Sequence, residues 1–102
     1  MLELRPACEN CGVSLPPNSV DAMICSFECT FCASCVTSVL ANVCPNCGGG
    51  FCPRPIRPAT RWKDDNYLGA RPATTRKLVK PVDPAFHRRF AESIQAIAPE
   101  NR

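Results

Sequence analysis

Apolar residues recur at helical spacing near the end of the chain. The repeat consists of Phe86, Phe90, Ile94 and Ile97. This spacing is typical of one apolar stripe on an amphipathic helix. Asp83 suits the N-cap, Pro84 suits the first helical position, and Pro99 ends the pattern. We therefore predict a helix over 83–98 that buries this stripe on the rest of the chain or on a partner, with His87 off the stripe and at the surface.

A second, shorter helix is predicted between Cys35 and Cys44. Ser34 is a candidate N-cap, and apolar residues follow it at helical spacing. We expect the apolar residues of this region to form the core; they are Phe27, Phe31, Val36, Val39 and Leu40.

The composition excludes a large apolar core. The chain has 102 residues, of which 9 are cysteine and 11 are proline, and the cysteines are counted in its 45% of hydrophobic residues. A chain of this size with so few core residues needs disulfides, a structural metal or a partner to fold. All the cysteines lie between Cys8 and Cys52, so the stabilising device is expected in that half.

The expected compartment decides how the cysteines are interpreted. The first residues, MLELRP, lack a basic segment followed by an apolar run, and no stretch approaches the ~20 apolar residues that span a bilayer. We therefore expect a cytoplasmic protein without membrane association. Thiols stay reduced in that compartment, and clustered thiols there usually bind metal.

The change in composition along the chain predicts three segments. Residues 1–52 form a cysteine module. Residues 53–82 begin with the run PRPIRP, which cannot be helical and is typical of an extended, basic arm. Residues 83–98 form the C-terminal amphipathic helix.

The cysteines fall into four closely spaced pairs. The pairs are Cys8 with Cys11, Cys25 with Cys29, Cys32 with Cys35, and Cys44 with Cys47. Two cysteines separated by two or three residues can direct both sulfurs at one tetrahedral Zn²⁺. Four pairs therefore predict two sites of four thiolates and two Zn²⁺ per chain, with Cys52 left over as a spectator. Spacing alone does not decide which pairs share an ion.

The order of the pairs resembles the RING finger family, in which the first and third pairs share one zinc and the second and fourth share the other. The resemblance implies a small metal-stabilised α+β fold, a RING-like or treble-clef double zinc module. It implies a first site of Cys8, Cys11, Cys32 and Cys35 and a second site of Cys25, Cys29, Cys44 and Cys47. Two other pairings stay open. One joins the CENCG and CPNCG segments as in rubredoxins and zinc ribbons, and the other is sequential.

Further segments point to a narrower group. They are LELRP at 2–6, CSFECTFC at 25–32, CPNCGG at 44–49 and RPATTR at 71–76. Together they are similar to short bacterial proteins catalogued as domain-of-unknown-function family 1272. The resemblance covers residues 1–81 and implies a bacterial zinc-binding protein, without implying an activity.

Charge is divided unevenly along the chain. The net charge is +3, but residues 1–52 carry one base against four acids, and residues 53–102 carry eleven bases against five acids. The basic stretch from Arg71 to Lys80 could contact nucleic acid or dock on the acidic half of this chain or of a second copy. Trp62, which lies between Arg61 and Lys63, could stack on unpaired bases, but we expect it to pack on the cysteine module.

These features favour a non-enzymatic, zinc-stabilised interaction or adaptor module, with a protein partner or a second copy bound through the C-terminal helix. Four-thiolate zinc sites have no open coordination position, and the single histidine supports no catalytic triad. Nucleic-acid binding through the basic tail is the alternative function. Two further hypotheses are a RING-type ubiquitin-ligase scaffold, which Asn10 and Gly48 disfavour by departing from that pattern, and a thiol redox sensor.

Overall fold

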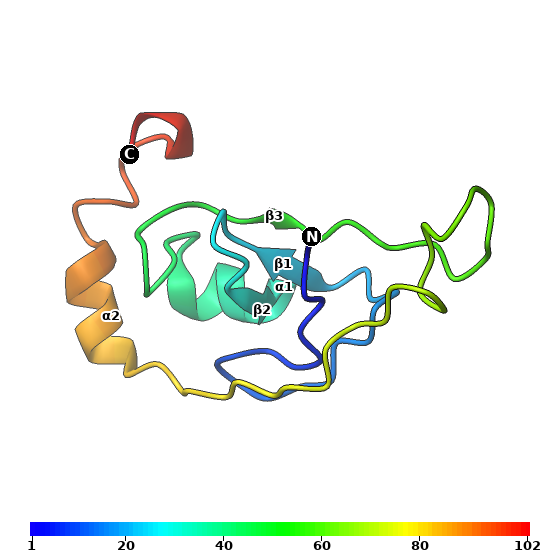
Figure 1. The fold of residues 1–102 in the computed structure, drawn as a ribbon. Helices are drawn as coiled ribbons and strands as arrows, with labels where there is room; N and C mark the ends of the chain where they lie inside the picture. The colour runs from blue at the N-terminus through cyan, green and yellow to red at the C-terminus, as the bar shows by residue number, and fades with distance from the viewer.

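A small antiparallel sheet, with a short helical segment directly after it, forms the centre of the fold (Figure 1). The computed structural model describes every residue from Met1 to Arg102. The strands are β1 (Ala22–Ile24), β2 (Thr30–Cys32) and β3 (Cys52–Pro53), in the order β2-β1-β3. The helical elements are α1 (Ala33–Cys35), the π-helix η1 (Val36–Leu40), α2 (Pro84–Ala91) and the 3₁₀-helix η2 (Pro99–Asn101). The chain therefore has the predicted α+β composition.

The sheet pairs a hairpin with a strand from a later part of the chain. Strands β1 and β2 form a hairpin in which Met23 lies opposite Phe31, and Ile24 on β1 also pairs with Cys52 on β3. All three residues of β2 are buried. Because α1 begins directly after Cys32, the same short stretch ends a strand and starts a helix.

The helix predicted after Ser34 exists, but its start differs from the prediction. Cys32 is the N-cap, and its sulfur accepts the backbone N–H of Cys35 at 3.4 Å, while Ser34 is exposed. A cysteine sulfur thus takes the place that an N-cap hydroxyl usually has. The segment continues as η1 and ends at Ala41, whose φ of 52° is left-handed.

The core consists largely of cysteines. Its buried cluster contains six cysteines and five other residues, which are Leu15, Ala22, Phe31, Val36 and Leu40. The expected burial of Phe31, Val36 and Leu40 is confirmed. Phe27 is 70% exposed, which contradicts its predicted place in the core. It lies in the turn of the β1–β2 hairpin, where its backbone N–H donates to the sulfur of Cys25.

The arm, residues 53–82, returns along the cysteine module without regular structure beyond β3 (Figure 1). Thr74 and Lys80 donate their backbone N–H groups to the carbonyls of Glu3 and Glu9, at 2.9 and 2.7 Å. Before that return, a loop closed by a bond from Leu68 to Pro58 projects away from the body, at the end opposite α2.

Trp62 does not pack on the cysteine module as predicted. It lies between Pro58 and Leu68, within the loop that their hydrogen bond closes, and is 81% exposed. The loop is closed by its own backbone hydrogen bonds, so it needs no apolar contact with the module to hold its shape.

The C-terminal helix is shorter than predicted and buries a different face. Asp83 caps α2 by accepting the N–H groups of Ala85 and Phe86, at 3.0 and 3.2 Å. The helix ends at Ala91, and residues 92–96 form turns. Phe86 is 67% exposed, whereas His87 is only 2% exposed, which reverses the prediction for both.

The burial of His87 has a specific partner on η1. Its Nε2 lies 2.9 Å from the carbonyl oxygen of Leu40, the last residue of that helix. That carbonyl also accepts the backbone N–H of Val43 at 3.0 Å, so the imidazole is its second donor. This hydrogen bond fixes which face of α2 meets the module.

We expect His87→Phe to destabilise the protein by about 1 kcal/mol, because it removes the imidazole hydrogen bond to the Leu40 carbonyl, which keeps only the Val43 N–H as donor. Phe86→Ala, one residue earlier and exposed, should change the free energy of unfolding by less than about 0.5 kcal/mol. Urea unfolding of both variants with zinc in excess tests the pair. A larger loss of stability in Phe86→Ala than in His87→Phe would contradict the packing of the His87 side of α2 on η1.

Candidate metal centre

Four cysteines meet in a first cluster. Their sulfurs all lie within 4.8 Å of one another, and the residues are Cys8, Cys11, Cys32 and Cys35. Cys8 and Cys11 come from a loop near the N-terminus, whereas Cys32 and Cys35 lie at the junction of β2 and α1. This is the interleaved grouping, in which the first pair meets the third. Neither the zinc-ribbon pairing nor the sequential pairing produces it.

A second cluster contains Cys25, Cys44 and Cys47, whose sulfurs also lie within 4.8 Å of one another. Cys29, the remaining residue of the predicted second site, is not within that distance of all three. It is buried nearby, and its sulfur accepts a hydrogen bond from Asn46 at 3.4 Å. Burial, together with the neighbouring Cys25 thiol, raises the pKa of Cys29.

The same turn positions the first cysteine pair of one cluster and the last pair of the other. The segments CENCG and CPNCG each close with a bond from the glycine N–H to the first cysteine carbonyl, at 3.0 Å for Gly12 and 2.8 Å for Gly48. Both glycines have left-handed φ angles, +77° and +78°. A residue with a Cβ adopts this conformation only with strain.

Backbone N–H groups point at the sulfurs in both turns. Cys11 and Asn46 each donate to the first sulfur of their own turn, Cys8 and Cys44 respectively, at 3.5 Å. Such donors favour the thiolate form, which is the form that binds metal. The turns therefore supply both the geometry and part of the electrostatics that a metal site needs.

We expect Gly48→Ala to lower the stability of the metal-loaded protein by about 1–2 kcal/mol, the cost of a left-handed alanine. Space is not the obstacle, since an added Cβ would meet Ile94 and Phe90 at ordinary contact distances, 3.6 and 3.8 Å. Gly48→Asn should cost less, because asparagine tolerates this conformation. Thermal unfolding of both variants tests whether Gly48→Ala loses more stability than Gly48→Asn. Equal losses of stability would point to steric crowding rather than to the left-handed backbone conformation.

The thiols have divergent acidities. Burial raises the pKa of Cys35 to about 12, and it also raises the pKa of Cys44. For Cys8, burial acts in the same direction, but hydrogen bonds from the Cys11, Cys32 and Asn10 backbones outweigh it and lower the pKa. A cation bound among these sulfurs must displace protons from the buried thiols, so acid is expected to release it.

The sulfur-only composition of both clusters fits a thiophilic metal. Thiolate sets of this kind select zinc, copper(I) or iron among biological metals, and four sulfurs in tetrahedral arrangement are typical of zinc or iron. Cys52 lies exposed on β3, outside both clusters. His87 is buried against η1 and belongs to neither cluster.

Two asparagines that the sequence analysis did not identify as site residues also contact the clusters. Asn10 donates its side-chain amide to the sulfur of Cys35 at 3.3 Å, as Asn46 does to Cys29 at 3.4 Å. Each precedes the second cysteine of its turn. The repeated C-x-N-C-G pattern in the sequence could have pointed to these two asparagines. It could not have shown which sulfur each one contacts, because Cys35 and Cys29 lie in other segments of the chain.

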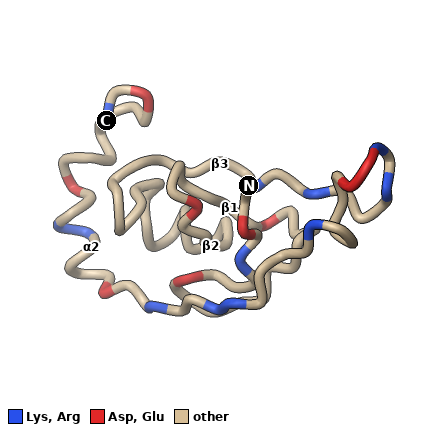
Figure 2. The backbone as a smooth tube through the Cα atoms, in the orientation of Figure 1, with Lys and Arg blue, Asp and Glu red and all other residues tan.

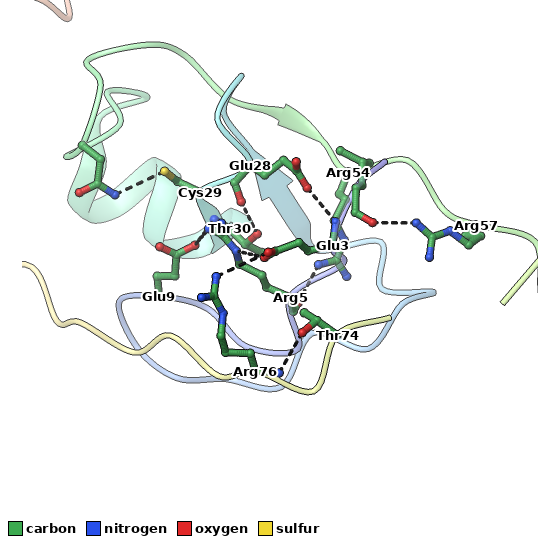
Figure 3. A network of polar contacts seen from close by, with 12 residues as sticks. Glu3, Arg5, Glu9, Glu28, Cys29, Thr30, Arg54, Arg57, Thr74 and Arg76 are labelled. Carbon is green, nitrogen blue, oxygen red and sulfur yellow. Dashed lines mark hydrogen bonds and ion pairs between the residues drawn. The ribbon is translucent and has the colours of Figure 1, made fainter. Parts of the chain in front are cut away.

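Three of the four acidic residues of the module make contacts within the chain, namely Glu3, Glu9 and Glu28 (Figure 3). Glu3 and Glu9 both pair with Arg5, at 2.9 and 3.1 Å, and Glu3 also lies 3.5 Å from Arg76 of the arm. Glu28 accepts the backbone N–H of Glu3 at 2.8 Å. The expected docking of the basic tail on this half is therefore carried by a single ion pair and several backbone bonds, rather than by the whole basic stretch.

Charged residues outside this network lie mainly along the arm and α2 (Figure 2). The exposed bases that form no ion pair there include Arg71, Lys77, Lys80, Arg88 and Arg89. None of the helices has the length and apolar character required to cross a membrane.

Comparison with known proteins places the chain among uncharacterised relatives. It is 54% identical over 81 residues to "Uncharacterized protein R02474" of Rhizobium meliloti (strain 1021), an alignment that covers 79% of this chain and 89% of the relative. No solved structure matches it. Residues 1–57, which contain every cysteine described above, match the family described as "Protein of unknown function (DUF1272)". The chain therefore belongs to the DUF1272 family, and its cysteine clusters are suited to binding metal.

Proposed function

We propose that this protein is a non-enzymatic interaction module whose fold is held by two Zn²⁺ in RING-like, interleaved sites. The observation that carries the proposal is the first cluster, because its four sulfurs come from distant segments and yet lie within 4.8 Å of one another. Such a site closes long loops of chain and adds stability that a small core cannot supply. Zn²⁺ fits four thiolates in tetrahedral geometry and introduces no redox chemistry.

The second site in this proposal contains Cys29 as its fourth ligand. The support comes from the two asparagines. In the first cluster, Asn10 bonds to Cys35, a sulfur supplied by the other cysteine pair of that cluster. By the same relation, the bond from Asn46 of the second turn to Cys29 supports Cys29 as the sulfur that would complete the set with Cys25, Cys44 and Cys47.

Saturated sites of this kind would act by stabilising structure rather than by catalysis. With four thiolates bound, no position is left for substrate or water. The surface available for a protein partner or a second copy is the part of α2 where Phe86 and Phe90 are exposed. Beside it, a hollow of about 430 Å³ is lined partly by Phe27, Ile94 and Ile97.

Native mass spectrometry of the freshly purified protein tests the metal content. Two zinc ions per chain are expected, and fewer than two in Cys29→Ser if that residue completes the second site. A single zinc in the unmodified protein would restrict the proposal to the first cluster. Iron in place of zinc would favour the redox alternative and give visible colour.

Nucleic-acid binding is a second candidate function. The specific observation in its favour is that the bases between Arg71 and Lys80 are exposed and only Arg76 among them forms an ion pair, while Trp62 is exposed in the adjoining loop. Trp62 is the only tryptophan, so quenching of its fluorescence by a single-stranded oligonucleotide reports contact directly. Neutralising about four phosphates predicts a log–log salt slope near −3. An absence of quenching at low salt would reject this candidate.

A further inference from the structure

Asn10 contacts both the first cysteine cluster and the arm. Its side-chain nitrogen donates to the sulfur of Cys35 at 3.3 Å, and its side-chain oxygen accepts the backbone N–H of Val82 at 2.8 Å. One amide group therefore joins a candidate ligand sulfur to a residue 72 positions away in sequence. With both ends engaged, the amide has one orientation that satisfies its two partners.

The arm is fixed on this turn by neighbouring contacts. Lys80 donates its N–H to the carbonyl of Glu9 at 2.7 Å, and an added Cβ on Gly12 would meet Val79 at 3.7 Å. Val82 also packs on the buried core. Immediately afterwards Asp83 caps α2, so the Val82 contact sets where that helix begins.

A second connection runs from the same cluster to the middle of α2. Cys35 is the last residue of α1, and η1 continues from it to Leu40, whose carbonyl contacts His87. The first cluster thus reaches the start of α2 through Asn10 and reaches His87 of α2 through η1. The segment carrying the exposed Phe86 lies between these two points.

Asn46 provides an internal comparison. It makes the same amide-to-sulfur bond, to Cys29, but no backbone group of the arm donates to its oxygen. Only Asn10 therefore joins a cluster to the arm, although the two turns share the C-x-N-C-G pattern.

We propose that Asn10 is a positioning residue that couples the first metal site to the placement of the arm and α2, so that metal binding at this site orders the surface carrying Phe86. The inference rests on the proposed zinc sites. A thiolate bound to metal is a stronger acceptor than a neutral thiol, so metal binding strengthens the bond that orients the Asn10 amide toward Val82. By linkage, a docked arm raises metal affinity at the first site by the same factor.

Two variants at one position test the coupling. Val82→Pro removes the N–H that Asn10 accepts, whereas Val82→Ala keeps that N–H and removes only packing. We expect Val82→Pro to weaken zinc binding at the first site about fivefold or more relative to Val82→Ala, measured by competition with a chelator. Equal affinities in the two variants would overturn the proposal.

Cadmium substitution shows which site responds. An all-sulfur site gives one cadmium NMR resonance, so two are expected from the loaded protein. Asn10→Ala should move one resonance and Asn46→Ala the other, because each removes an amide donor from one cluster. Val82→Pro should move only the resonance assigned through Asn10, and a shift of neither would contradict the coupling.

Amide exchange of α2 in the loaded protein completes the test. Asn10→Ala should speed exchange of the His87 N–H, which donates within α2 to Asp83, and Asn46→Ala should not. Equal exchange rates in the two variants would overturn the coupling. A chain that binds no metal would instead disprove the proposed zinc sites, so the two failures are distinguishable.

Discussion

Cys44→Ser is expected to abolish the folded state of the cysteine module. Cys44 is fully buried and belongs to the second cluster, where its sulfur lies within 4.8 Å of those of Cys25 and Cys47. A structural zinc contributes on the order of 10 kcal/mol or more to folding. This exceeds what a small domain with so few apolar core residues can retain without the metal. Circular dichroism and NMR dispersion, with a zinc count on the same sample, measure the loss.

Cys52→Ser is the matched control for this prediction. Cys52 is exposed on β3 and lies outside both clusters. We therefore expect the free energy of unfolding of the Cys52→Ser variant to stay within about 0.5 kcal/mol of that of the unmodified protein. A Cys44→Ser protein with an unchanged melting curve would show that the cluster does not hold the fold. Cys29→Ser should behave like Cys44→Ser rather than like Cys52→Ser if it completes the second site.

The closely spaced cysteine pairs could be recognised as metal-binding turns from sequence, because the geometry of each turn is local. Two cysteines separated by two residues, followed by glycine, form one turn whose hydrogen bonds lie within five residues, as in the turns ending at Gly12 and Gly48. The extended arm was also predictable, since PRPIRP excludes a helix. Which turns meet in space depends on the whole chain, so the interleaved grouping needed a resemblance and then the structure.

The errors arose where burial depends on what an element contacts. Helical spacing correctly suggested a helix after Asp83, but periodicity cannot reveal that the available acceptor is the Leu40 carbonyl, which selects His87 rather than Phe86 for burial. Trp62 was expected to enlarge the core, yet its loop closes on its own backbone. In a chain whose core is largely cysteine, the apolar character of a side chain predicts its burial less well than its hydrogen bonds to the cysteine module do, as His87 shows.

Arg54 illustrates a residue whose role the sequence did not reveal. It lies in the run PRPIRP, which predicts an exposed, extended arm, yet its side chain is only 4% exposed. Its guanidinium donates to the carbonyls of Arg5, Leu15 and Pro16, at 2.8, 3.2 and 3.0 Å. The side chain thereby joins the start of the arm to two loops of the cysteine module.

We expect Arg54→Met to destabilise the metal-loaded protein by about 2–3 kcal/mol. Three carbonyls lose a charged donor, and such hydrogen bonds contribute about 1.5–3 kcal/mol each. The net loss is smaller than their sum, because Nε is buried without an acceptor and burial of the cation lowers its pKa, which marks a desolvation cost that methionine removes. Denaturant unfolding with zinc in excess measures the difference.

Two control variants separate the hydrogen bonds from the other properties of Arg54. Arg57→Met removes a half-buried guanidinium that donates to Leu2 and Arg71, at 2.7 and 2.6 Å, and should cost about 1 kcal/mol, since water can replace it more easily. Arg54→Lys keeps the charge, but a single ammonium cannot reproduce the planar fork that reaches all three carbonyls. If Arg54→Lys were as stable as the unmodified protein, charge alone would suffice. If Arg54→Met were neutral, burying the guanidinium would cost as much as its three hydrogen bonds contribute, and the arm would be held by its backbone contacts with Glu3 and Glu9.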